Sequence, residues 1–177
     1  LDGDHTLRVF PSRPWHESYK NDGAFQIIKF TVKGGKADPT KPTTTNTGQT
    51  VANANSAPKT EGKDVLPSNA GQVDPTKPLL TYSRPKGEYD LTASDKIMID
   101  FWLTNAKLAG DGGEYRVRIK IDSADPIYLE KWEPVWLTGW VPGVKSMFAL
   151  ELVDRDGKIV ENGDFNRTTR DVSIVKK

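Results

Sequence analysis

The sequence predicts an all-β protein whose strands are antiparallel. Apolar and polar side chains alternate without interruption from Tyr115 to Ile121, as they do in a strand with one buried face. A second alternating row, residues 97–103, places its apolar side chains on one face in the same way. Turn sequences at 111–113 and 162–163 separate stretches of this kind, and no segment keeps a helical period. Short strands joined by tight turns are typical of a sandwich or a barrel.

The composition permits a folded core and excludes several classes of site. Of the 177 residues, 36% are hydrophobic and 28% are charged, and 25 basic side chains nearly balance 24 acidic ones. A net charge of +1 gives no basic excess for nucleic acid, and the apolar runs are too short to span a bilayer. With no cysteine, the chain has no disulfides, thiolate metal sites or cysteine nucleophiles. It begins at Leu1 without a signal peptide, as a processed chain or a cut fragment would.

Residues 1–33 are predicted to form a β-hairpin. Residues 5–9 alternate as a half-buried strand does, and residues 25–32 are rich in β-branched and aromatic side chains. Because the adjacent Ile27 and Ile28 break the alternation, we expect a β-bulge there. Two prolines and an Asp-Gly step between the strands indicate a loop.

The hairpin carries more apolar surface than two strands can bury between them, and a lone hairpin is marginal in water. We therefore expect it to lie against the rest of the chain, or to add its strands to a sheet edge. The alternative is a poorly ordered remnant of a missing domain.

Residues 34–78 are predicted to form a flexible, disordered linker. They are mainly Thr, Asn, Pro, Gly, Ala and Lys, with too few large apolar side chains to offset the entropy of ordering them. The sequence Asp-Pro-Thr-Lys-Pro occurs at 38–42 and again at 74–78. This duplication fits an insertion, although chance in a biased composition would also produce it.

Residues 79–177 have the length of one Ig-like β-sandwich, which is about 100 residues. Besides the two rows described above, residues 148–152 and 172–174 each place apolar side chains on one face. We therefore expect this segment to be a complete antiparallel Ig-like sandwich that folds on its own.

The end of the chain also repeats its beginning. Residues 143–153 begin with a glycine and continue as an alternating strand, as residues 3–10 do. An Asn-Gly step and a Phe then lead into the last strand, much as Asn21 to Phe25 lead into the second strand of the hairpin. We interpret this as two tandem copies of one module, the first represented only by its final two strands.

Three stretches resemble uncharacterised bacterial secreted or envelope proteins with tandem Ig-like domains: residues 7–18, 79–87 and 150–157. The resemblance implies an Ig-like fold and an extracytoplasmic location, which is periplasmic, cell-surface or secreted. It implies no activity, and no functional residue is carried over. Where the first copy has His5, the second has Lys145, which argues against a required histidine in the module.

Arg13, Trp15 and His16 form the densest polar and aromatic cluster of the sequence, and they are candidate ligand-binding residues. Function concentrates on loops held by a rigid scaffold, and these residues lie in the predicted hairpin loop. The alternative is a loop that is pinned by packing of Trp15 and by local hydrogen bonds.

Trp132, Trp136 and Trp140 recur every four residues and are the second group of candidate ligand-binding residues. If exposed together, they would form an aromatic platform for sugar rings, as in a carbohydrate-binding module. Alternatively, they cover an open edge of the sandwich or lie in its core.

The sequence contains no recognisable catalytic motif, so we expect no enzyme activity and no cofactor. Its two histidines, His5 and His16, are too few to indicate a metal site. Residues 154–157 predict an Asp-Gly turn rather than a calcium loop. The sequence thus favours a non-catalytic structural or interaction module that binds a protein or a glycan of the cell envelope. A carbohydrate-binding module is the alternative.

Overall fold

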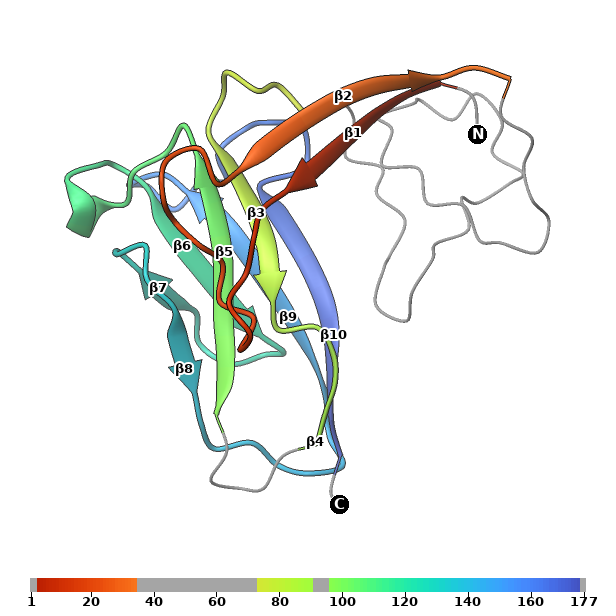
Figure 1. The fold of residues 1–177 in the computed structure, drawn as a ribbon. Coiled ribbons are helices and arrows are strands. Elements are labelled where there is room, and N and C mark those ends of the chain that lie inside the picture. Colours follow the sequence, from red (N-terminus) through yellow and green to blue (C-terminus); the bar gives the residue numbers. More distant parts are fainter. Residues whose placement is uncertain (1–2, 35–72, 91–95, 176–177) are drawn as a thin grey trace, which may run out of the picture.

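The protein is built from strands, and the prediction of an all-β fold is confirmed (Figure 1). The computed structural model describes residues 3–34, 73–90 and 96–175. The strands are β1 (Gly3–Val9), β2 (Gln26–Val32), β3 (Leu79–Arg84), β4 (Gly87–Asp90), β5 (Ile97–Thr104), β6 (Arg116–Ile121), β7 (Ile127–Leu129), β8 (Val135–Leu137), β9 (Lys145–Val153) and β10 (Arg167–Val175). One short 3-10 helix, η1 (Ala109–Asp111), precedes β6. Within the described ranges, no helix has the length and apolar character that crossing a membrane requires.

The strands form three sheets. The first is the β1-β2 hairpin, the second has the order β4-β10-β9-β6-β7, and the third has the order β3-β5-β8. Every pair is antiparallel except β10 with β4, which pair in parallel from Val172↔Gly87 to Val175↔Asp90. The expectation of purely antiparallel pairing is therefore wrong at this edge. The cause is that the chain leaves the third sheet after β3 and continues in β4, which joins the second sheet.

The second and third sheets pack face to face around one core, as in a β-sandwich. Alternation turns every second side chain of β5, β6, β9 and β10 toward the opposite sheet. The predicted inward rows are confirmed, since most of their members are buried in one cluster: Ile97, Ile99, Phe101, Leu103, Val117, Ile119, Phe148, Leu150, Leu152, Val172 and Ile174. Tyr115 and Ile121, at the ends of one row, are partly buried and pack against this cluster. Each such side chain contributes about 1.5–3 kcal/mol when it is fully buried.

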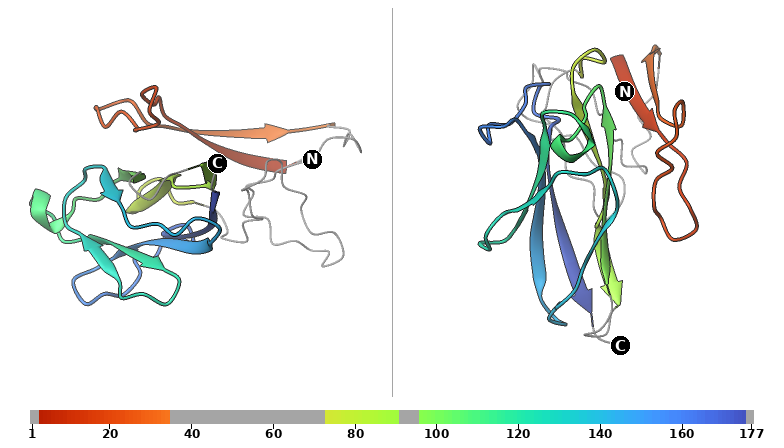
Figure 2. Two further views of the ribbon diagram at one scale, coloured as in Figure 1. Left: turned by 90° about the horizontal axis from the view of Figure 1, so that it is seen from below. Right: turned by 90° about the vertical axis from the view of Figure 1, so that its left-hand side faces the viewer.

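The hairpin strands extend beyond the sandwich (Figure 2). Their pairing runs without a shift from Gly3↔Val32 to Val9↔Gln26, so the expected bulge at Ile27 and Ile28 is absent. No bulge is needed, because neither face of this hairpin is fully buried. Ile27 lies on one face and is half-buried, while Ile28 lies on the other and is exposed.

Residues 73–78 pack against the sandwich ahead of β3. Val73 is buried, and the Asp74 amide donates a hydrogen bond to the Asn162 side-chain oxygen at 2.8 Å. The Asn105 side-chain nitrogen donates to the Pro75 carbonyl at 2.6 Å. Ordered packing thus begins before Leu79, in residues that their composition had assigned to the linker. Residues 35–72 of the predicted linker lie outside the described residues.

Candidate functional site

The loop that connects β1 to β2, residues 10–25, lies on the outer face of the third sheet (Figure 2). Asp100 of β5 points to that face, because its neighbours Ile99 and Phe101 point into the core. The Asp100 carboxylate is fully buried and accepts hydrogen bonds from the Ser18 amide and hydroxyl, each at 3.0 Å. The Lys20 ammonium donates to the same carboxylate at 2.7 Å. A buried charge is thus paired and hydrogen-bonded, as burial requires.

An aromatic stack completes this contact. Phe10 and Phe25, at the two ends of the connecting loop, stack on Trp102 of β5 with ring centroids 6.2 and 5.3 Å away. Trp132 meets the same indole edge-on at 5.0 Å. The loop therefore makes extensive contact with the third sheet, while the strands β1 and β2 pair only with each other.

The structure brings Arg13 and Trp15 together at the surface of the connecting loop. The Arg13 guanidinium lies over the rings of Trp15 and Tyr19, at 5.4 and 4.7 Å from their centroids. Trp15 is 52% exposed, and its indole nitrogen donates to the Glu17 carboxylate at 2.8 Å. The cluster is therefore a solvent-facing stack, and local hydrogen bonds within the loop hold it in place.

His16 lies beside this stack, and it lines the pocket that is described below. Its backbone adopts a φ of 72°, in the left-handed region that few side chains tolerate. The turn is held because the His16 amide donates to the Arg13 carbonyl at 2.8 Å. His5 lies in β1, where its ring stacks on Phe30 with centroids 5.2 Å apart. Among the described residues, no group of three His, Asp or Glu side chains is placed to hold a metal ion.

The three tryptophans of the second candidate group do not share one exposed face. Trp132 and Trp140 are half-buried, and their indole nitrogens donate to the Phe101 and Leu137 carbonyls at 3.0 and 3.1 Å. Only Trp136, on the edge strand β8, is exposed, at 49%. Two of the three indoles thus pack against the core at the edge of the sandwich.

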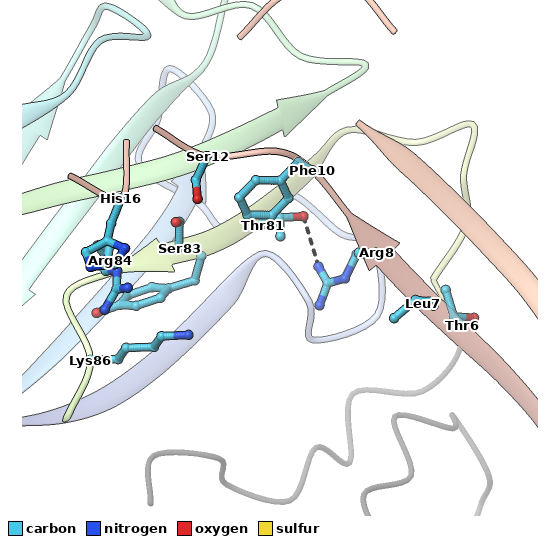
Figure 3. Close-up of a pocket in the computed structure, with 11 residues that line it drawn as sticks. Thr6, Leu7, Arg8, Phe10, Ser12, His16, Thr81, Ser83, Arg84 and Lys86 are labelled. Carbon is cyan, nitrogen blue, oxygen red and sulfur yellow. Dashed lines mark hydrogen bonds between the residues drawn. The ribbon is translucent and has the colours of Figure 1, made fainter. Parts of the chain in front are cut away.

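A pocket of about 380 Å³ lies between β1 with its connecting loop and β3 with the segment that follows it (Figure 3). Four of its lining residues are basic: Arg8, His16, Arg84 and Lys86. Hydroxyl side chains supply much of the remaining lining, and none of the lining residues that the structure describes is acidic. Sequence reasoning missed this pocket because Arg8 and Arg84 are far apart in the chain and belong to no motif.

Arg8 has no carboxylate partner among the described residues. Its guanidinium donates to the Thr81 hydroxyl at 3.0 Å and lies 5.4 Å from the Phe165 ring centroid. Burial, followed by the nearby Arg170 guanidinium, lowers the pKa of Arg8 below its ordinary value. Burial also raises the pKa of the neighbouring Tyr82, whose hydroxyl donates to the Pro85 carbonyl.

The turn at Asp154 forms as predicted. The Gly157 amide donates to the Asp154 carbonyl at 3.1 Å, and the Asp154 carboxylate accepts from the Asp156 and Lys158 amides at 3.0 and 2.9 Å. The carboxylate is thus engaged in closing the turn.

Comparison of the chain with models of protein families, with curated proteins and with solved structures found no match.

Proposed function

We propose that the protein is a non-catalytic Ig-like structural or interaction module of a secreted or cell-envelope protein. The strand orders support the Ig-like assignment. The sheet β3-β5-β8 corresponds in order to strands A, B and E of an Ig-like sandwich, and β10-β9-β6-β7 corresponds to G, F, C and C′. Within the described residues there is no counterpart of strand D.

We propose that the hairpin is the end of a preceding copy of the same module, and the strand pairing supports this interpretation. In the sandwich, β9 and β10 pair antiparallel and would be strands F and G. β1 and β2 pair in the same way and share their sequence pattern, so they correspond to strands F and G of a first copy. The resemblance to tandem Ig-like proteins of the bacterial envelope supports the extracytoplasmic location.

The observation that carries an interaction role is the pinned connecting loop. Asp100 and Trp102 hold its base against the third sheet, while Arg13, Trp15 and Tyr19 stack on its solvent side. Exposed aromatic and arginine side chains on a loop that is already ordered are typical of binding surfaces, because little conformational entropy is lost on binding. The proposed partner is a protein or a glycan of the cell envelope.

A binding experiment with matched variants tests this role. The intact chain and its Trp15→Ala variant are compared for binding to purified envelope fractions and to a glycan array. Tyr128→Ala is the control, because Tyr128 is also exposed and also lies under an arginine, Arg116, at 4.8 Å. We expect binding that falls at least about tenfold in Trp15→Ala and is unchanged in Tyr128→Ala.

Two results would contradict the proposal. Equal binding by Trp15→Ala and the intact chain would exclude the connecting loop as the surface. Loss of glycan binding in a Trp136→Ala variant, with Trp15→Ala unaffected, would favour the carbohydrate-binding alternative, because Trp136 is the exposed member of that group.

A further inference from the structure

The basic pocket between the hairpin and β3 is separate from the Trp15 surface, and its size suits a small molecule. Its volume of about 380 Å³ lies at the lower end of the range for small-molecule sites. Figure 3 shows Arg8, Arg84 and Lys86 around one space, with the Ser83 and Thr81 hydroxyls on the strand between them.

The described residues that line the pocket include positively charged side chains and no negatively charged one. The whole chain has nearly equal numbers of basic and acidic residues, 25 and 24, yet the pocket has basic residues and no acidic one. Elsewhere in the described residues, the buried carboxylates of Asp100 and Glu151 are paired with cations. The described ion pairs include none that involves Arg8, Arg84 or Lys86. The pocket therefore concentrates positive charge that no carboxylate of the described residues neutralises.

Of the basic side chains in the pocket, Arg8 has the greatest need of an anionic partner. It is half-buried, and the acceptor that the described residues give its side chain is the neutral Thr81 hydroxyl. A partly desolvated guanidinium without a carboxylate partner is unfavourable until an anion joins it. An oxyanion satisfies the planar donor fork of an arginine with two parallel hydrogen bonds.

We infer that this pocket binds a small anionic ligand through a phosphate, sulfate or carboxylate group, which Arg8, Arg84 and Lys86 would contact. The hydroxyl side chains of the lining, such as Thr81, Ser83 and Ser12, suit the hydroxyl groups of a sugar that carries the anion. The oxyanion is thus either free in solution or carried on a monosaccharide. The inference goes beyond the proposed interaction role, because it assigns a second site with a ligand of its own.

Titration of the full chain with defined probes tests the inference. The probes are inorganic phosphate, glucose 6-phosphate, glucuronate and neutral glucose, followed by amide NMR shifts at the pocket and by calorimetry. We expect phosphate or the two sugar anions to bind at the pocket, with affinity that falls as ionic strength rises, and glucose not to bind. Tighter binding of the sugar anions than of phosphate would identify a sugar-borne oxyanion, and the reverse would identify a free one.

Charge-removing variants localise the binding. Arg84→Gln and Lys86→Gln are each expected to weaken it about tenfold or more, since each removes a charge-assisted hydrogen bond. Arg155→Gln removes the same charge from an exposed turn on the other sheet and should change affinity less than about twofold. Arg8→Gln should have the largest effect. Since it also removes the contact with Thr81, its fold is checked by circular dichroism, and the Arg84 and Lys86 variants decide if it does not fold.

Three results would overturn the inference. The first is no binding of any anion at millimolar concentration. The second is equal binding of glucose and glucose 6-phosphate, which would show that charge is not recognised. The third is an equal loss of affinity in Arg155→Gln and Arg84→Gln, which would show general attraction to a positive surface. None of these measurements depends on whether Trp15 binds an envelope partner, so the two proposals fail separately.

Discussion

One carboxylate is buried on the outer face of each sheet of the sandwich, yet the two obtain their partners in different ways. Glu151 on β9 is paired with Arg118 of β6 at 2.6 Å and with Arg167 of β10 at 3.3 Å. These strands flank β9, and the three residues are directly opposite one another in the register. Asp100 on β5 instead takes its partners, Ser18 and Lys20, from the connecting loop about 80 positions earlier.

The difference shows how the two outer faces depend on the rest of the chain. The Glu151 cluster is complete as soon as β6, β9 and β10 pair, because all three side chains belong to one sheet. The Asp100 cluster exists only while the connecting loop is docked. Docking of the loop both buries the Asp100 carboxylate and supplies its partners, so that release of the loop would return this carboxylate to water. The partners of Glu151, in contrast, do not depend on the loop.

The largest effect is expected from Glu151→Ala. It leaves the half-buried Arg118 without its carboxylate, and we expect the free energy of unfolding to fall by about 3 kcal/mol. The loss should be global, so that all probes of urea unfolding shift together. A change of under about 1 kcal/mol would mean that solvent replaces the carboxylate at little cost.

A smaller and more local effect is expected from Asp100→Ala. We expect a loss of about 2 kcal/mol, because Lys20 on the released loop regains water while the Ser18 amide loses its acceptor. Limited proteolysis should cut the connecting loop much faster than in the intact chain, whereas Glu151→Ala should leave that rate unchanged below its unfolding transition. Equal cutting of both variants under native conditions would contradict the comparison.

Double-mutant cycles measure single pairs on the two faces. For Lys20→Met with Asp100→Asn we expect a coupling energy of about 1.5 kcal/mol, since both side chains are largely buried. For Arg167→Gln with Glu151→Gln we expect about 0.5 kcal/mol, because Arg167 is 58% exposed and screened by water. The reverse order would show that the loop contact contributes little beyond its aromatic stack.

The pH dependence of stability in the alkaline range tests a third polar group, Tyr82, separately from the two carboxylates. Burial raises its pKa above the ordinary value of 10.0, so the unfolded chain loses this proton before the folded one does. The stabilisation that this raised pKa gives to the folded chain is complete below about pH 10. As pH rises from about 10 to about 11, the free energy of unfolding falls by at most about 1 kcal/mol for this reason. Tyr82→Phe should remove this part of the pH dependence in urea unfolding. An unchanged slope would show that Tyr82 ionises normally.

The smallest effect is expected from Lys145→Gln. Lys145 and Asp171 form an ion pair at 2.7 Å between β9 and β10, but their side chains are 62% and 54% exposed. Removing the charge should change the free energy of unfolding by less than about 0.5 kcal/mol. A larger loss would show that distance alone, without burial, decides the strength of pairs in this sheet.

The core strands could be predicted because their signal is local. Alternation in residues 97–103 and 115–121 predicts which side chains face inward without any information from the rest of the chain. The short strands β4 and β8 carry no such signal. β4 is defined by its parallel pairing with β10, and β8 by three residues opposite β5.

The candidate sites could be predicted only in part, because their partners are distant in sequence. Arg13 and Trp15 were singled out correctly as neighbours, since they lie within one loop. Asp100 follows the alternation and is expected to face solvent, and only the tertiary contact with Ser18 buries it. The basic pocket likewise depends on how Arg8 and Arg84 meet across two elements. No local pattern encodes such meetings.

Trp102 also makes the docking of the loop visible by spectroscopy. Its indole contacts the rings of both Phe10 and Phe25, which also contact each other, and stands nearly perpendicular to Trp132, at an angle of 87°. Closely spaced indoles in a fixed, non-parallel arrangement couple their electronic transitions and give a strong near-ultraviolet circular dichroism signal. Release of the loop would change both this signal and the fluorescence of Trp102 without any added label. The kinetics of loop opening can therefore be followed in the intact, unmodified chain.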